Sequence, residues 1–120
     1  MARKKEITLG NPLKEEKEVE RLLAIFADMD SNMLQLLKPL FINAAFITVV
    51  IEDLRDIINK TGYVEKYENG GGQSGIKEST YVKLHKDYSK LLKDALSCLA
   101  GYVPKAKKKE TLELALSKLR

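Results

Sequence analysis

The sequence is poor in the residues that most often build catalytic or metal-bound sites. Its 120 residues include one cysteine, one histidine and no tryptophan. His85 has no second histidine and no cysteine pair to complete a metal ligand set. Cys98 has no basic partner nearby in sequence, so we interpret it as a small packed side chain rather than a nucleophile. These absences predict no metal, no cofactor and no catalytic residues, and therefore a protein that is not an enzyme.

Long uncharged runs are also missing. The longest, Pro39 to Ile51, covers thirteen residues, whereas a helix that crosses a bilayer needs about twenty. The N-terminal segment MARKKEITLG carries charge but lacks the apolar stretch of a secretory signal. With a single cysteine, this composition predicts no membrane span and a protein of the reducing cytoplasm.

Helical periodicity is what the sequence does contain. From Met33 to Ile58 apolar residues recur at alternating intervals of four and three, whereas a strand would need a period of two. This predicts a helix over 32–60, with Leu36, Phe41 and Phe46 adding apolar surface beside the stripe. The residues of this seam, assigned to the core or to oligomerisation, are Leu37, Leu40, Ala44, Ile47, Ile51, Leu54 and Ile58.

The same spacing returns after a glycine-rich stretch. A helix is predicted to begin near Glu78 or Ser79 and to end at Gly101 and Pro104. Its seam also includes Cys98 and Tyr102, and Leu92, Leu96 and Leu99 widen it. The seam residues assigned to the core or to oligomerisation are Tyr81, Leu84, Tyr88, Leu91 and Ala95.

Capping residues, glycines and prolines predict where the elements begin and end. Asn11 and Pro12 predict the cap and first residue of a helix over 12–29, and Asn32 with Gln35 predicts a capping box for the next. Thr61 and Gly62 predict its end. Residues 61–77 form a short β-hairpin or a flexible loop. Pro39 predicts either a kink or a helix start nearer residue 38.

Together these elements predict an all-α fold: a long antiparallel helical hairpin with an N-terminal helix and a short C-terminal helix. The apolar stripes are wider than one partner helix needs, so we expect the chain to oligomerise through heptad-like seams. Asn43 and Thr48 interrupt the stripe; they either fix the register of pairing or lie at its exposed edge.

Positive charge is concentrated at the two ends. Residues 1–10 hold three basic residues against one acidic, residues 104–120 six against two, and residues 11–103 twelve against fourteen. This divides the chain into a basic arm (1–10), a helical core (11–103) and a basic tail (104–120), in which Thr111 to Leu119 form a short amphipathic helix. Cationic ends suggest an anionic partner, although lysines at chain ends also serve solubility.

The segment order resembles a known family. The most telling segments are AAF (44–46) leading into IEDLRDIIN (51–59), and YVKLHKDYSKLLKDAL (81–96). Over residues 4–104 the chain is similar to the small subunits of the DNA-packaging terminase from tailed phages of Gram-positive bacteria. Two places depart from the family pattern: Ser79 and Thr80 stand where many relatives have a proline, and KAKKK replaces an acidic tail.

The resemblance implies a non-enzymatic subunit, in the cytoplasm of an infected host cell, that assembles as a ring-like homo-oligomer. It would bind viral double-stranded DNA at the packaging start and deliver it to the terminase large subunit, which carries the ATPase and nuclease. Candidate docking residues for the large subunit are Leu112, Ala115, Leu116 and Leu119. Candidate phosphate contacts without base readout are Arg3, Lys4, Lys5, Lys105, Lys107, Lys108 and Lys109.

Two other functions compete with this one. A helical adaptor or regulatory protein would bind a protein partner and no nucleic acid. A helix-turn-helix repressor would need a short helix pair with a tight glycine turn and a polar base-reading face, and neither is found in the sequence.

Overall fold

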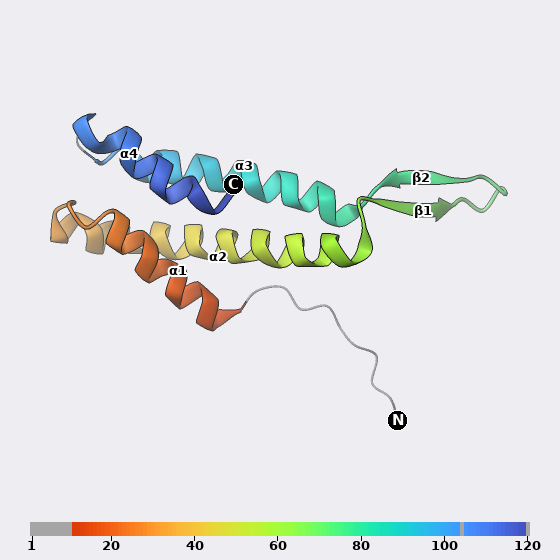
Figure 1. The fold of residues 1–120 in the computed structure, drawn as a ribbon, viewed down its shortest axis with the longest axis horizontal. Coiled ribbons are helices and arrows are strands. Elements are labelled where there is room, and N and C mark those ends of the chain that lie inside the picture. Colours follow the sequence, from red (N-terminus) through yellow and green to blue (C-terminus); the bar gives the residue numbers. More distant parts are fainter. Residues whose placement is uncertain (1–10, 104, 120) are drawn as a thin grey trace, which may run out of the picture.

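The computed structural model describes residues 11–103 and 105–119 and shows an elongated, mainly helical molecule (Figure 1). Helices α2 (Ser31–Thr61) and α3 (Thr80–Ala100) lie side by side and antiparallel. Strands β1 (Val64–Glu68) and β2 (Ser74–Glu78) connect them as a two-stranded hairpin that projects beyond the helices. The predicted helical hairpin is confirmed, and the small sheet makes the molecule mainly, rather than wholly, helical.

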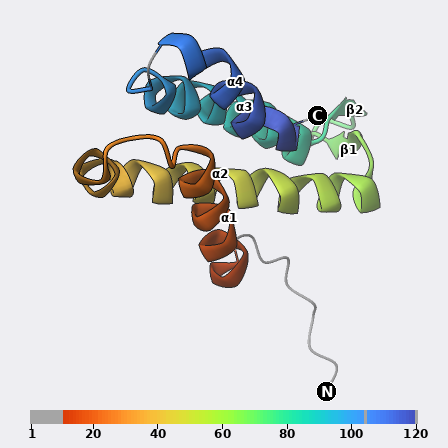
Figure 2. The same ribbon diagram turned by 60° about the vertical axis from the view of Figure 1, so that its left-hand side comes forward.

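The two remaining helices lie across the other end of the helical hairpin. Helix α1 (Pro12–Ile25) crosses α2, and α4 (Lys105–Leu116) folds back along α3 before a short 3-10 turn (Ser117–Leu119). The turned view shows the steep crossing of α1 over α2 (Figure 2). All four helices meet at this end, where the core is built.

The core is centred on aromatic and aliphatic side chains from different helices. Phe26, just after α1, meets Phe41 of α2 edge to face, with ring centroids 5.2 Å apart, an arrangement that aromatic rings favour. The leucine stripe of α3 and one alanine of α4 complete the cluster. Its fully buried members are Leu22, Phe26, Phe41, Ala44, Ala45, Ile51, Leu92, Leu96, Leu99 and Ala115.

The helix starts follow local chemistry. The Asn11 side chain accepts hydrogen bonds from the amides of Leu13 and Lys14, so the predicted cap of α1 is confirmed. Helix α1 ends at Ile25 rather than 29, because a tight turn at Phe26 reverses the chain toward α2. Helix α2 is capped by Asp30, whose carboxylate accepts from the Met33 amide, and not by the expected Asn32 box.

Further expectations concern the interior and the end of α2. The helix runs unbroken through Pro39, so a start near residue 38 is wrong. Thr48 is buried, and its hydroxyl donates to the Ala44 carbonyl of the same helix, whereas Asn43 is exposed. Gly62 ends α2 with φ of +90°, a conformation that glycine adopts without a steric penalty.

By length and composition, α2 also qualifies as a membrane span among the described helices. Half of its most apolar stretch is buried against the rest of the chain, as in the core helix of a folded domain.

Candidate functional site

The seam predicted on α2 is largely used inside the chain. Of its members only Leu40 is exposed; the other six are buried, and they are Leu37, Ala44, Ile47, Ile51, Leu54 and Ile58. The chain's own helices cover these six side chains, which places them in the core, one of the two roles assigned to the seam. A surface for assembly must therefore lie on a part of α2 away from these buried residues.

On α3 the buried stripe lies beside the predicted seam. Leu92, Leu96 and Leu99 are fully buried. Leu91 is 51% exposed and Cys98 is also exposed, so the interpretation of Cys98 as a packed side chain is wrong. Tyr102, at the end of the predicted seam, is exposed as well. The other predicted seam residues are partly buried, and they are Tyr81, Leu84, Tyr88 and Ala95. A heptad seam assumes one partner helix, whereas α3 packs against both α2 and α4.

Four large apolar side chains remain uncovered on the N-terminal half of α2. Leu36 is 72% exposed, Leu40 42%, Ile42 49% and Phe46 41%. Their spacing places them on one continuous strip of the helix surface, with Pro39 and Asn43 between them. We call these four residues the outer strip of α2. An exposed apolar strip of this kind is typical of a protein–protein contact.

The C-terminal helix packs on the core of its own chain. Thr111 and Ala115 are buried, and Leu112 and Leu116 are partly buried against the core cluster. Helix α4 begins at Lys105 rather than Thr111, so the lysine cluster forms its first turns. With α4 in place, a partner can reach only parts of Leu112 and Leu116 and none of Ala115, whereas Leu114 of the same helix is 51% exposed.

A charged cluster holds the end of α4. The Glu18 carboxylate, whose side chain is 1% exposed, accepts two hydrogen bonds of 2.9 Å from the Arg21 guanidinium and one ion pair of 2.9 Å from Lys118 Nζ. Arg21 also donates to the carbonyls of Leu114 and Ala115 in the last turn of α4. Basic groups satisfy carbonyls at helix C-termini in this way. Sequence reasoning missed this cluster because its members lie about ninety residues apart.

Most of the candidate DNA contacts lie outside the described residues. Arg3, Lys4 and Lys5 do so entirely, and so do the side chains of Lys105, Lys107 and Lys108. The side chain of the docking candidate Leu119 does as well. Lys109 is described, and it is exposed in the first half of α4.

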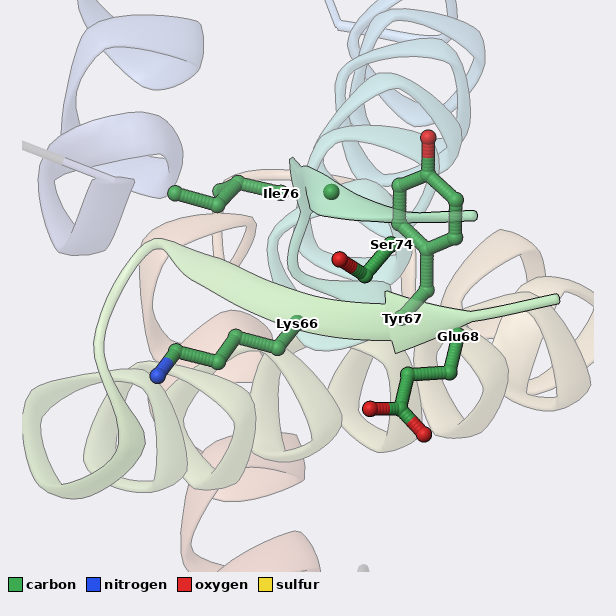
Figure 3. Close-up of a pocket in the computed structure, with 6 residues that line it drawn as sticks. Lys66, Tyr67, Glu68, Ser74 and Ile76 are labelled. Atoms are coloured by element: carbon green, nitrogen blue, oxygen red, sulfur yellow. The ribbon is translucent and has the colours of Figure 1, made fainter. Parts of the chain in front are cut away.

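The β-hairpin carries a shallow hollow of about 360 Å³. Figure 3 shows the Tyr67 ring projecting to one side of β1, and Lys66 and Glu68 to the other. Tyr67 pairs with Gly75 across the strands, and a Cβ on Gly75 would lie 2.8 Å from the Tyr67 hydroxyl. The glycine thus makes room for the aromatic ring. This hollow gathers no group of catalytic side chains.

Within residues 11–103 and 105–119, no three His, Cys, Asp or Glu side chains are grouped to hold a metal ion. Comparison of the chain with protein-family models, with curated proteins and with solved structures finds no match.

Proposed function

We propose that this chain is the small subunit of a phage DNA-packaging terminase. It assembles with copies of itself, binds viral double-stranded DNA and presents it to the large subunit, which supplies the ATPase and nuclease. The observation that carries the proposal is the segregation of charge: the helical core is net negative, and the basic surplus lies in residues 1–10 and 104–120. Such ends suit the DNA backbone, because lysine and arginine bind phosphates without reading sequence.

The fold supports this role in two further ways. The outer strip of α2 supplies an uncovered apolar surface for contact between subunits. The lysine cluster stands on the first turns of α4, and α4 is fixed to the body through Glu18 and Arg21. The helix backbone that carries these lysines is thereby attached to the body.

The test is the salt dependence of DNA binding. In a variant with Lys105, Lys107, Lys108 and Lys109 changed to Gln, affinity for a short duplex falls. The slope of log affinity against log salt decreases by about 0.9 for each phosphate that is no longer neutralised. Fluorescence anisotropy measures both quantities.

The matched control for the tail variant changes four exposed lysines of the body to Gln. These lysines have no ion pair among the described residues. These are Lys17, Lys38, Lys66 and Lys90. The two variants have the same net charge, so only the position of the charge differs between them. Equal effects on DNA binding would contradict the tail as the DNA contact.

A second candidate is a helical adaptor that binds a protein partner and no nucleic acid. The outer strip of α2 favours it, because an exposed apolar surface serves any protein partner. If the wild-type chain does not bind duplex DNA at low salt, the adaptor function is favoured over the terminase function.

A further inference from the structure

A groove lies where the helical hairpin meets the β-hairpin. It has a volume of about 310 Å³ and lies between the last turns of α2 and the first turns of α3, with Tyr63 beside it. Arg55 and Asn59 line it from α2, and His85 and Lys86 from α3. None of these residues belongs to the basic ends. Ile58 and Val82 also line the groove, which therefore combines apolar side chains with several hydrogen-bond donors on the body of the molecule.

Arg55 is the unusual member of the groove. It is partly buried and has no hydrogen-bond or ion-pair partner among the described residues. A guanidinium has five N–H donors in a planar fork, and no buried side-chain nitrogen among the described residues lacks a partner, so the Arg55 donors still reach the solvent. Lys86 differs, because its ammonium already pairs with Glu78 at 2.7 Å. Among the described residues, Arg55 is therefore the groove cation whose donors remain available to a ligand.

His85 adds a donor without adding charge. Burial lowers the pKa of its imidazole, and the nearby Arg55 charge lowers that pKa further, so the ring is neutral at pH 7. A neutral imidazole donates one hydrogen bond and accepts another. Together with the Asn59 amide, it offers neutral donors around a single guanidinium, which is a suitable arrangement for one compact oxyanion.

We propose that this groove binds a phosphate group, with the Arg55 guanidinium as its bidentate partner. The inference rests on the proposed function in one respect: it names a backbone phosphate of DNA as the source, which adds a contact on the body to those at the ends. A DNA phosphate is chosen over the carboxylate of an acidic peptide because DNA is the partner named by the proposed function and arginine is a frequent bidentate partner of phosphate.

Phosphate binding is tested on the full-length ¹⁵N-labelled chain by NMR. Inorganic phosphate is titrated while the Arg55 Nε–H and His85 ring signals are followed, with sodium chloride at equal ionic strength as the reference. We expect saturable shifts with phosphate only, and a Kd about tenfold weaker in Arg55→Gln. Arg55→Lys keeps the charge but not the fork, so it gives an intermediate Kd and a second variant if Arg55→Gln misfolds. Absence of saturable shifts, or shifts with a glutamate-rich peptide and none with phosphate, would overturn the site.

The source of the phosphate is tested with duplex DNA. Arg55→Gln is expected to reduce the salt slope of DNA binding by about one. The control is Lys38→Gln, an exposed lysine of the same helix about 25 Å away at the helical rise per residue. An unchanged slope together with saturable phosphate shifts would support a site for free phosphate and exclude DNA as the source. If the wild-type chain binds no duplex at all, the proposed function fails, and the phosphate titration still decides the site.

Discussion

Glu18 links the first helix of the chain, α1, to the last helix, α4. Its carboxylate is almost completely withdrawn from water, yet it contacts two cations, one from its own helix and one from the turn after α4. A buried charge is tolerated only where such partners replace its hydration. Arg21 in turn donates to the last carbonyls of α4. This single acidic residue therefore organises the contact between α1 and α4.

Glu18→Gln is predicted to loosen α4. Glutamine keeps the size of the side chain but removes the negative charge, so the Arg21 guanidinium and Lys118 ammonium no longer have an anion between them. We expect the free energy of unfolding to fall by about 1–3 kcal/mol, as measured by urea denaturation. Hydrogen exchange should also become faster in residues 109–118.

Glu16→Gln is the matched control, because Glu16 is an exposed glutamate of the same helix. If the two variants are equally stable, the cluster does not hold α4 in place.

Among the elements, the β-hairpin is the one with the least apolar support. It is attached to α3 by polar contacts instead: the Glu65 carboxylate accepts from the hydroxyl and the amide of Thr80, and Lys86 pairs with Glu78. Lys77 on the opposite strand adds an ion pair to Glu65 at 3.2 Å. The Thr80 bond is the chief reason that the pKa of Glu65 lies below its ordinary value of 4.5, and the Lys77 contact is the next.

The attachment of the hairpin is predicted to weaken in acid. A carboxyl group with a lowered folded-state pKa stabilises the folded contact above its unfolded-state pKa, and this contribution disappears as the pH falls through the folded-state value. The Thr80 amide signal should therefore titrate with a midpoint below 4.5, as followed by NMR.

In Glu65→Gln this titration should disappear, because no proton is taken up at that position. A midpoint at or above the ordinary glutamate value, or a titration that persists in the variant, would show that Glu65 does not anchor α3.

For the whole molecule, the arrangement of the helices decides which surface is left for a second subunit. Helices α1 and α3 pack against α2, and they leave the outer strip uncovered. This surface differs from the heptad seam expected from the sequence, although Leu36, Leu40 and Phe46 belong to the apolar surface that the sequence predicts. The proposed assembly therefore depends on a few half-exposed side chains.

A double variant, Leu36→Ser with Phe46→Ser, is predicted to prevent self-association. We expect wild-type protein to have a mass of several chains by light scattering at micromolar concentration, and the variant to approach the mass of one chain. The reason is reduced apolar burial, since each side chain contributes about 1.5–3 kcal/mol when fully covered.

Leu114→Ser is the control, because Leu114 is an exposed leucine outside the strip. Wild-type protein that stays a single chain under these conditions would contradict the assembly and weaken the terminase proposal.

Much of the fold could be predicted because its signals are local. The Asn11–Pro12 start, the Gly62 end and the three-four spacing of α2 each depend on neighbours within about one helical turn. The glycine-rich stretch is compatible with either a hairpin or a loop. The antiparallel pairing of β1 with β2, in which Lys66 pairs with Ile76, shows that it is a hairpin.

The candidate site could be predicted only in part. The basic ends are visible in the sequence, but the choice of Leu92 over Leu91 as a core residue depends on where two other helices pack against α3. The Arg55 groove likewise brings together residues about thirty positions apart. No local pattern contains that information.

The amino-acid sequence alone determines where α1 begins and α2 ends, that the body is acidic and the ends basic, and that α2 is the apolar centre of the chain. Packing determines which apolar face is covered, that α4 is fixed by Glu18 and Arg21, and that Arg55 lines a groove without a hydrogen-bond or ion-pair partner among the described residues. The physical reason is range: caps and periodicity act over a few residues, whereas burial and ion pairing depend on segments that only the folded chain brings together.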